Sequence, residues 1–141
     1  MKKILSIVLI LSAAVILLVT GLLLNSDHKD KNANVDLSVL NDGMAYSEVC
    51  YIAERPAEYK GKKIKMKGTL TEIPDKDKVH YLCVVGDSAG CCAQGLEFEL
   101  AEGEDPGNKK EITILGTFDT YKIMNDEFII LRNTKIIEEK K

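Results

Sequence analysis

The chain has 141 residues and a formal net charge of −3 at pH 7, which is enough for one ordinary domain and too short for a two-domain enzyme. Residues 1–24 hold two lysines and no acidic residue, so the remaining 17 basic and 22 acidic side chains give a net charge of −5. This acidic remainder lacks the basic surface that non-specific nucleic-acid binding requires, and it is too apolar to be disordered.

The first 24 residues predict a membrane anchor. Residues 4–24 carry no charge, and as a helix they span about 30 Å, the hydrocarbon thickness of a bilayer. A cleaved signal peptide is the alternative, although its apolar stretch is normally shorter and the residues after Leu24 form a poor cleavage site. Lys2 and Lys3 predict a cytoplasmic N-terminus, so residues 25–141 are expected outside the cell membrane, with the lipid bilayer as partner of the anchor.

A polar segment and a helix are expected next. Asn, Asp and Lys dominate residues 25–43, which predicts a tether. The domain itself is expected over residues 44–137, followed by a charged tail at 138–141. It begins with a helix from Met44 to Arg55, which places Met44, Val49 and Ile52 on one face and ends before Pro56.

Five strands are expected after the helix, because the apolar period changes to two. In the first strand Ile64 and Met66 face inward. A basic stripe lies on the opposite, solvated side, where it either protects the strand or meets an anionic lipid or polymer; its members are Lys62, Lys63, Lys65 and Lys67. A charged turn at 74–78 follows, and the other strands are expected at 79–85, 95–100, 111–121 and 127–137.

Two similar strings indicate how these strands are arranged. Ile64-x-Met66-x-Gly68 is echoed by Ile112-x-Ile114-x-Gly116, so each string places a glycine inside a strand, where glycine usually marks a bulge or a bend. Bent strands can serve two sides of a small closed barrel. The fold class is therefore predicted as mainly β, a five-stranded OB-like barrel with one helix at its start. A different small sheet carrying a helix is the alternative.

Two further strings resemble a group of small bacterial exported domains. They are Pro56-x-x-Tyr59-x-Gly61-Lys62-x-Ile64-x-Met66-x-Gly68 and, after Cys83, Cys91-Cys92-x-Gln94-Gly95-Leu96-Glu97-Phe98. Members of this group are secreted or anchored to the membrane, with an OB-like fold and mostly no assigned function. A similar barrel with adjacent cysteines accompanies proteins regarded as permease subunits. The resemblance covers residues 44–137 and implies a fold and a location, without an activity.

The cysteines carry the main chemical signal. Cys50 is expected as a small buried side chain of the helix. Because Cys83, Cys91 and Cys92 fall within ten residues, we expect the Cα atom of Cys83 to lie within about 7 Å of that of Cys91 or Cys92. Three interpretations stay open: a structural disulfide or buried thiols, a zinc site completed by His80 or an outside ligand, and a redox or catalytic thiol.

The loop between the second and third expected strands is the predicted contact surface, together with the barrel face. Asp87 or Ser88 is expected to cap one helical turn that Gly95 ends, and such a turn lowers the pKa of the Cys91 and Cys92 thiols. The candidate loop residues are Asp87, Ser88, Gly90, Gln94 and Gly95.

Other catalytic or metal-binding patterns are scarce in the sequence. Asp75 and Asp77 lack the glycine and glutamate that complete a calcium loop, and Glu97 with Glu99 is interpreted as a solvated strand face. We therefore expect a non-catalytic, membrane-anchored binding or accessory module for an unidentified protein or cell-envelope ligand, in which the cysteine cluster is structural or a ligand site. The alternative is a thiol–disulfide or zinc-handling protein that uses the cluster, as an accessory to a membrane permease.

Overall fold

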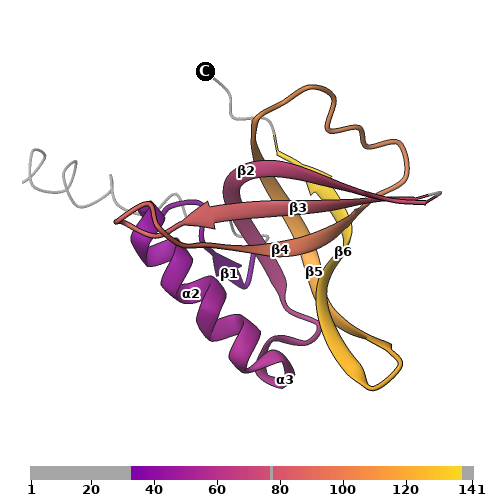
Figure 1. Cartoon of the computed structure of the whole chain (residues 1–141), viewed down its shortest axis with the longest axis horizontal. Helices are drawn as coiled ribbons and strands as arrows, with labels where there is room; N and C mark the ends of the chain where they lie inside the picture. Colours follow the sequence, from indigo (N-terminus) through magenta and orange to yellow (C-terminus); the bar gives the residue numbers. More distant parts are fainter. Residues whose placement is uncertain (1–32, 77, 138–141) are drawn as a thin grey trace, which may run out of the picture.

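A computed structural model describes residues 33–76 and 78–137 (Figure 1). The expected anchor at residues 4–24, the orientation derived from it and the charged tail at 138–141 lie outside the described residues. In the part of the chain that is described, no helix has both the length and the apolar character needed to cross a membrane.

The domain is mainly β, with its helices at the start, as the sequence predicted. Five long strands follow one helix and one short helical segment. The elements are β1 (Val35–Asp36), α2 (Asp42–Glu54), α3 (Pro56–Tyr59), β2 (Lys63–Asp75), β3 (Lys78–Gly86), β4 (Ala93–Leu100), β5 (Glu111–Ile123) and β6 (Asp126–Ile136).

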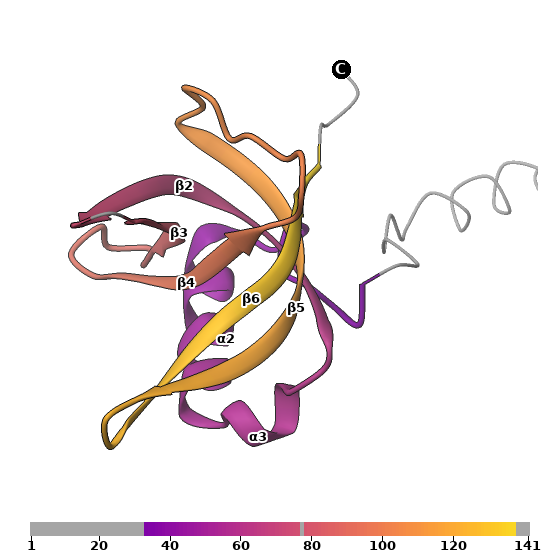
Figure 2. The same cartoon turned by 90° about the vertical axis from the view of Figure 1, so that its right-hand side faces the viewer.

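The five long strands form a near-barrel ring (Figure 2). Their order is β2-β3-β4-β6-β5, and β5 pairs back onto β2. All pairs in the ring are antiparallel except β4–β6, which is parallel. The short strand β1 joins β2 from outside the ring in parallel, so the sheet as a whole is mixed.

The two strand glycines lie where strands change partner or register. β2 pairs with β5 as far as Thr69 and with β3 from Thr69 onward, so it bends next to Gly68. A Cβ atom on Gly68 would lie 2.5 Å from the carbonyl oxygen of Val84, which leaves room for glycine alone. The β5–β6 register shifts at Gly116, where a Cβ atom would clash with Thr134. The predicted bend and bulge are therefore confirmed.

The core lies inside the ring and against α2. The strands contribute buried apolar side chains at alternate positions, including the predicted Ile64 and Met66, and α2 adds Val49 and Ile52. The expectation for Met44 is wrong, because its side chain is 54% exposed. The helix begins at Asp42 and buries Ala45 instead, so positions i, i+4 and i+7 from Ala45 form the inner face.

The folded part begins earlier than the predicted domain boundary. Residues 33–43 were expected in the tether, yet Val35 and Asp36 pair with β2 and the side chain of Leu37 is buried. The backbone N–H of Leu37 donates a hydrogen bond of 2.7 Å to the carbonyl oxygen of Lys65. This pairing partly covers Lys65, whereas the other lysines of the basic stripe are exposed: Lys62, Lys63 and Lys67.

Candidate metal centre

The turn between β3 and β4, residues 87–92, brings two cysteines and an aspartate together. The antiparallel ladder runs as far as the pair Gly86–Ala93, and the N–H of Asp87 then donates to the carbonyl oxygen of Cys92 at 2.9 Å. Gly90 has φ +70, a left-handed conformation that suits glycine. The expected helical turn is therefore wrong, because residues 87–92 form a hairpin turn with no helical residue.

Asp87 organises the turn through both oxygens of its carboxylate. Its Oδ1 accepts hydrogen bonds from the backbone N–H groups of Cys91 at 3.0 Å and Cys92 at 3.3 Å. Its Oδ2 accepts a hydrogen bond from the thiol of Cys91 at 3.2 Å. The two Sγ atoms lie 3.7 Å apart, and one ligand atom from each of the three residues lies within 4.8 Å of the others.

The carboxylate changes the acidity of the neighbouring thiol. The hydrogen bond from Cys91 is the largest cause of the lowered pKa of Asp87. The same bond, followed by the contact with Cys92, raises the pKa of Cys91. The expected lowering is therefore wrong for Cys91, because the backbone N–H groups of the turn point to Asp87 and a negative charge faces the thiol.

Cys83 does not belong to this group. It is fully buried opposite Leu96 inside the ring, and burial raises the pKa of its thiol to about 12. The Asp87–Cys92 bond lies four residues further along the hairpin, which corresponds to about 13 Å at the usual strand rise. The predicted approach within about 7 Å is therefore wrong. The described chain contains four free thiols, of which Cys50 is partly buried.

His80 is also separated from the cysteines. Its Nδ1 lies 2.7 Å from Oε1 of Glu97 on the outer face of the ring. Among the described residues, no histidine joins the group formed by Asp87, Cys91 and Cys92. Of the residue sets proposed from the sequence, the structure therefore brings together only one acidic loop residue and the adjacent cysteine pair.

The remaining loop candidates support the turn from its two sides. Gly95 lies in β4, where a Cβ atom would be 2.9 Å from the carbonyl oxygen of Cys83, and Gln94 pairs with Val85. Ser88 contacts the start of α2, because a Cβ atom on Gly43 would lie 3.2 Å from that of Ser88. The turn is thus attached to a rigid hairpin on one side and a helix on the other (Figure 1).

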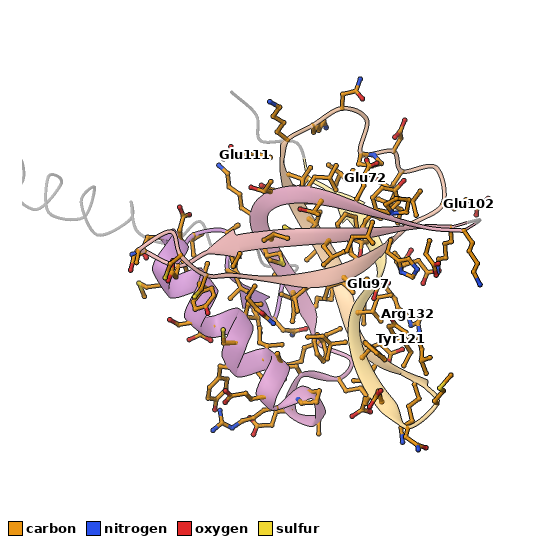
Figure 3. All side chains as sticks on the ribbon, viewed as in Figure 1. Glu72, Glu97, Glu102, Glu111, Tyr121 and Arg132 are labelled. Carbon is orange, nitrogen blue, oxygen red and sulfur yellow. The ribbon has the colours of Figure 1, made fainter. Side chains whose placement is uncertain are left out.

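A second polar cluster, missed from the sequence, lies on the outer face of the ring, and Figure 3 labels three of its members, Glu97, Tyr121 and Arg132. Glu97 accepts a hydrogen bond of 2.6 Å from the hydroxyl of Tyr121 and also contacts His80. Arg132 donates to Glu99 and to Asp119, at 2.9 Å each. The side chain of Glu97 is only 18% exposed, so the predicted solvated face is wrong at this position.

The carboxylates of the outer-face cluster are all paired within the cluster or with Lys60. Each of its carboxylates has a basic or hydroxyl partner, and Asp119 has a second cation in Lys60 at 3.5 Å. The sequence of each strand alternates polar and apolar residues, which predicts that these polar side chains face outward. The meeting of the side chains depends on strand order and register, which the alternation alone does not specify.

Comparison with protein-family models, curated proteins and solved structures gave no match for this chain. The resemblance to small exported domains therefore stays a prediction. The chemistry of the site has to be inferred from its own donor atoms and their spacing.

Proposed function

We propose that this protein is a non-catalytic, membrane-anchored OB-like module outside the cell membrane, and that it binds a thiophilic divalent metal ion, with Zn²⁺ as the first candidate. Asp87, Cys91 and Cys92 are the proposed ligands. This is the zinc-handling alternative from the sequence, with Asp87 in place of Cys83 and His80.

The spacing of the donor atoms carries the proposal. A tetrahedral zinc ion with Zn–S bonds of about 2.3 Å and a Zn–O bond of about 2.0 Å holds two sulfurs about 3.8 Å apart and a sulfur and an oxygen about 3.5 Å apart. The corresponding distances are 3.7 Å between the two Sγ atoms and 3.2 Å from Cys91 Sγ to Asp87 Oδ2. Two of the three donor pairs are therefore close to the spacing that one ion requires, and the third pair, Cys92 with Asp87, lies within 4.8 Å.

The hydrogen bonds of the turn also suit metal binding. Oδ1 of Asp87 is held by two backbone N–H groups, which leaves Oδ2 for the thiol of Cys91. Oriented carboxylates of this kind raise metal affinity. Metal binding would release the protons of both thiols to water. Oδ2 would then contact the metal ion in place of the Cys91 thiol proton.

The fold and location in the proposal have separate support. The five long strands follow one another around the ring in the order β2-β3-β4-β6-β5, and β4 and β6 pair in parallel. This Greek-key arrangement is consistent with an OB-like barrel. The apolar residues 4–24 and the two preceding lysines support a membrane anchor with the domain outside. The carboxylate of Asp87 raises the pKa of the Cys91 thiol, whereas catalytic thiols have a lowered pKa, which favours binding over catalysis.

Metal titration of the full-length protein in detergent, reduced and metal-free, tests the proposal. We expect one Zn²⁺ per chain by native mass spectrometry, and thiolate charge-transfer absorption when Cd²⁺ is used instead. Cys91→Ser and Cys92→Ser should abolish tight binding, and Asp87→Asn should weaken it, because a neutral amide oxygen replaces a carboxylate ligand. Cys50→Ser is the matched control and should bind normally. Equal binding by the Cys91→Ser/Cys92→Ser double variant and the natural protein would refute the site.

A further inference from the structure

The proposed metal site has three protein ligands and an open side. Structural zinc sites are almost always closed by four protein ligands. In residues 33–76 and 78–137, no fourth histidine, cysteine or acidic group joins Asp87, Cys91 and Cys92. Both cysteines are exposed on the turn. Because both thiols are exposed, a fourth ligand can reach the proposed site from another molecule.

The turn is held by hydrogen bonds among its own residues. Its backbone is closed by the Asp87–Cys92 hydrogen bond and by the bonds that the Asp87 carboxylate accepts. The hydrophobic core, by contrast, includes none of residues 87–92. A metal ion at the turn is not required to assemble the fold, unlike the ion of a zinc finger, whose binding energy is folding energy.

The three ligands also differ in how firmly they would hold a soft ion. Thiolates are the preferred ligands of thiophilic metals, whereas a carboxylate oxygen is a harder and weaker one. Oδ1 of Asp87 keeps its hydrogen bonds from the N–H groups of Cys91 and Cys92 whether or not Oδ2 binds the metal, and water can solvate the released Oδ2 at this turn. Asp87 is therefore the ligand that is displaced at the lowest cost.

From these three observations we infer that the turn is a transfer site, which hands its metal to a partner protein that offers thiolate or imidazole ligands. This inference rests on the proposed function. A donor atom of the partner gives its electron pair to the metal at the open position, and the bond to Asp87 breaks. The bonds to Cys91 and Cys92 break next, and the two thiolates take protons from water. The metal does not change its oxidation state.

Exchange kinetics of the zinc-loaded full-length protein test this inference. Stopped-flow mixing with the nitrogen-donor dye 4-(2-pyridylazo)resorcinol, at rising dye concentration, follows removal of the metal. We expect a rate that increases in proportion to dye concentration, because the incoming ligand attacks the open position. A cysteine-containing peptide should accelerate removal in the same way. Asp87→Asn should release the metal several-fold faster, and Cys50→Ser should release it at the natural rate.

The metal-free protein provides the second readout. We expect it to keep its β-type circular dichroism spectrum and a cooperative thermal transition. A slow rate that is independent of dye concentration, or loss of the folded spectrum without metal, would overturn the transfer role and leave the metal site intact. Failure to bind Zn²⁺ or Cd²⁺ in the metal titration would overturn the site itself, so the two failures are distinguishable.

Discussion

At the scale of single residues, Asp87 decides the chemistry of the turn. Its carboxylate accepts hydrogen bonds from two backbone N–H groups and one thiol, which lowers its own pKa and raises that of Cys91. The carboxylate thus keeps Cys91 as a thiol, and in the proposed site a metal ion would replace the thiol proton. In this arrangement one side chain both shapes the loop and controls the reactivity of its neighbour.

Asp87→Asn should make Cys91 more reactive in the metal-free protein. The asparagine oxygen can still accept the N–H groups, but the negative charge beside the thiol is lost, so the pKa of Cys91 falls and its thiolate fraction at pH 7–8 rises. Iodoacetamide labelling at several pH values, read by peptide mass spectrometry, should show the Cys91 profile displaced to lower pH. An unchanged profile would contradict the assigned role of Asp87.

Cys83 is the internal control in the same labelling experiment. Burial raises the pKa of its thiol to about 12, so at pH 8 only about one molecule in 10,000 carries the thiolate. It should stay unmodified while the protein is folded and react once urea unfolds it. Modification of Cys83 at the rate of Cys91 in the folded protein would show that Cys83 does not face the interior of the ring and that the register of the β3–β4 hairpin is wrong.

The candidate site could be predicted only in part from the sequence. The adjacent cysteines and Asp87 could be identified as candidates because they lie together in a short run of small residues. The exclusion of Cys83 could not be predicted, because it depends on how far the β3–β4 ladder runs before the turn closes. A ladder that ended two residues earlier would bring Cys83 closer to Cys91 and Cys92. The spacing of the cysteines in the sequence does not show where the ladder ends.

At the scale of elements, the long strands β2 and β5 close the ring by bending at glycine. Their positions were predictable, since a glycine inside an apolar alternation has few roles other than a bend or a bulge. The strand β1 was not predictable, because two residues show no periodicity. The error at Met44 has a different origin: Met44 lies five residues before Val49 and hence about 140° away around the helix, whereas Ala45 lies four residues before it and shares its face.

Gly68→Ala should destabilise the domain by about 1–3 kcal/mol or more, because the added Cβ atom would lie 2.5 Å from a backbone carbonyl oxygen that cannot move freely. Urea unfolding followed by circular dichroism gives the free energy of unfolding. The matched control is Thr69→Ala at the next, exposed position, which should cost under about 1 kcal/mol. Equal effects of the two substitutions would argue against a close approach of β2 and β3 at Gly68.

At the scale of the whole molecule, the parallel pair β4–β6 is the least regular closure of the ring. Its register shifts between Phe98 and Leu100, so few backbone pairs join these strands. The outer-face cluster spans this region. Glu97 of β4 reaches Tyr121 of β5, and Arg132 of β6 reaches Glu99 of β4. Side chains therefore reinforce the closure where the backbone ladder is irregular.

The Glu97–Tyr121 bond should make the stability of the ring depend on alkaline pH. Burial, and then the hydrogen bond and charge of Glu97, raise the pKa of Tyr121 from 10.0 to about 12. Because the folded state holds this proton more tightly than the unfolded state, the stabilisation is fully present below pH 10 and is lost as the pH rises from 10 to about 12. Tyr121→Phe removes the hydroxyl and leaves Glu97 without one of its two partners.

We expect Tyr121→Phe to lower the free energy of unfolding by about 1–3 kcal/mol at pH 7, the usual effect of losing a hydrogen bond to a charged group. The difference between the natural protein and the variant should shrink as the pH rises from 10 towards 12, because the natural protein loses the same bond by deprotonation. Urea unfolding at pH 7, 9, 10 and 11 measures this difference, in which the titration of lysines common to both proteins cancels. Tyr51→Phe, at an exposed tyrosine, should show little effect at any of these values. A difference that stays constant from pH 7 to 11 would contradict a stabilising hydrogen bond from the Tyr121 hydroxyl to Glu97.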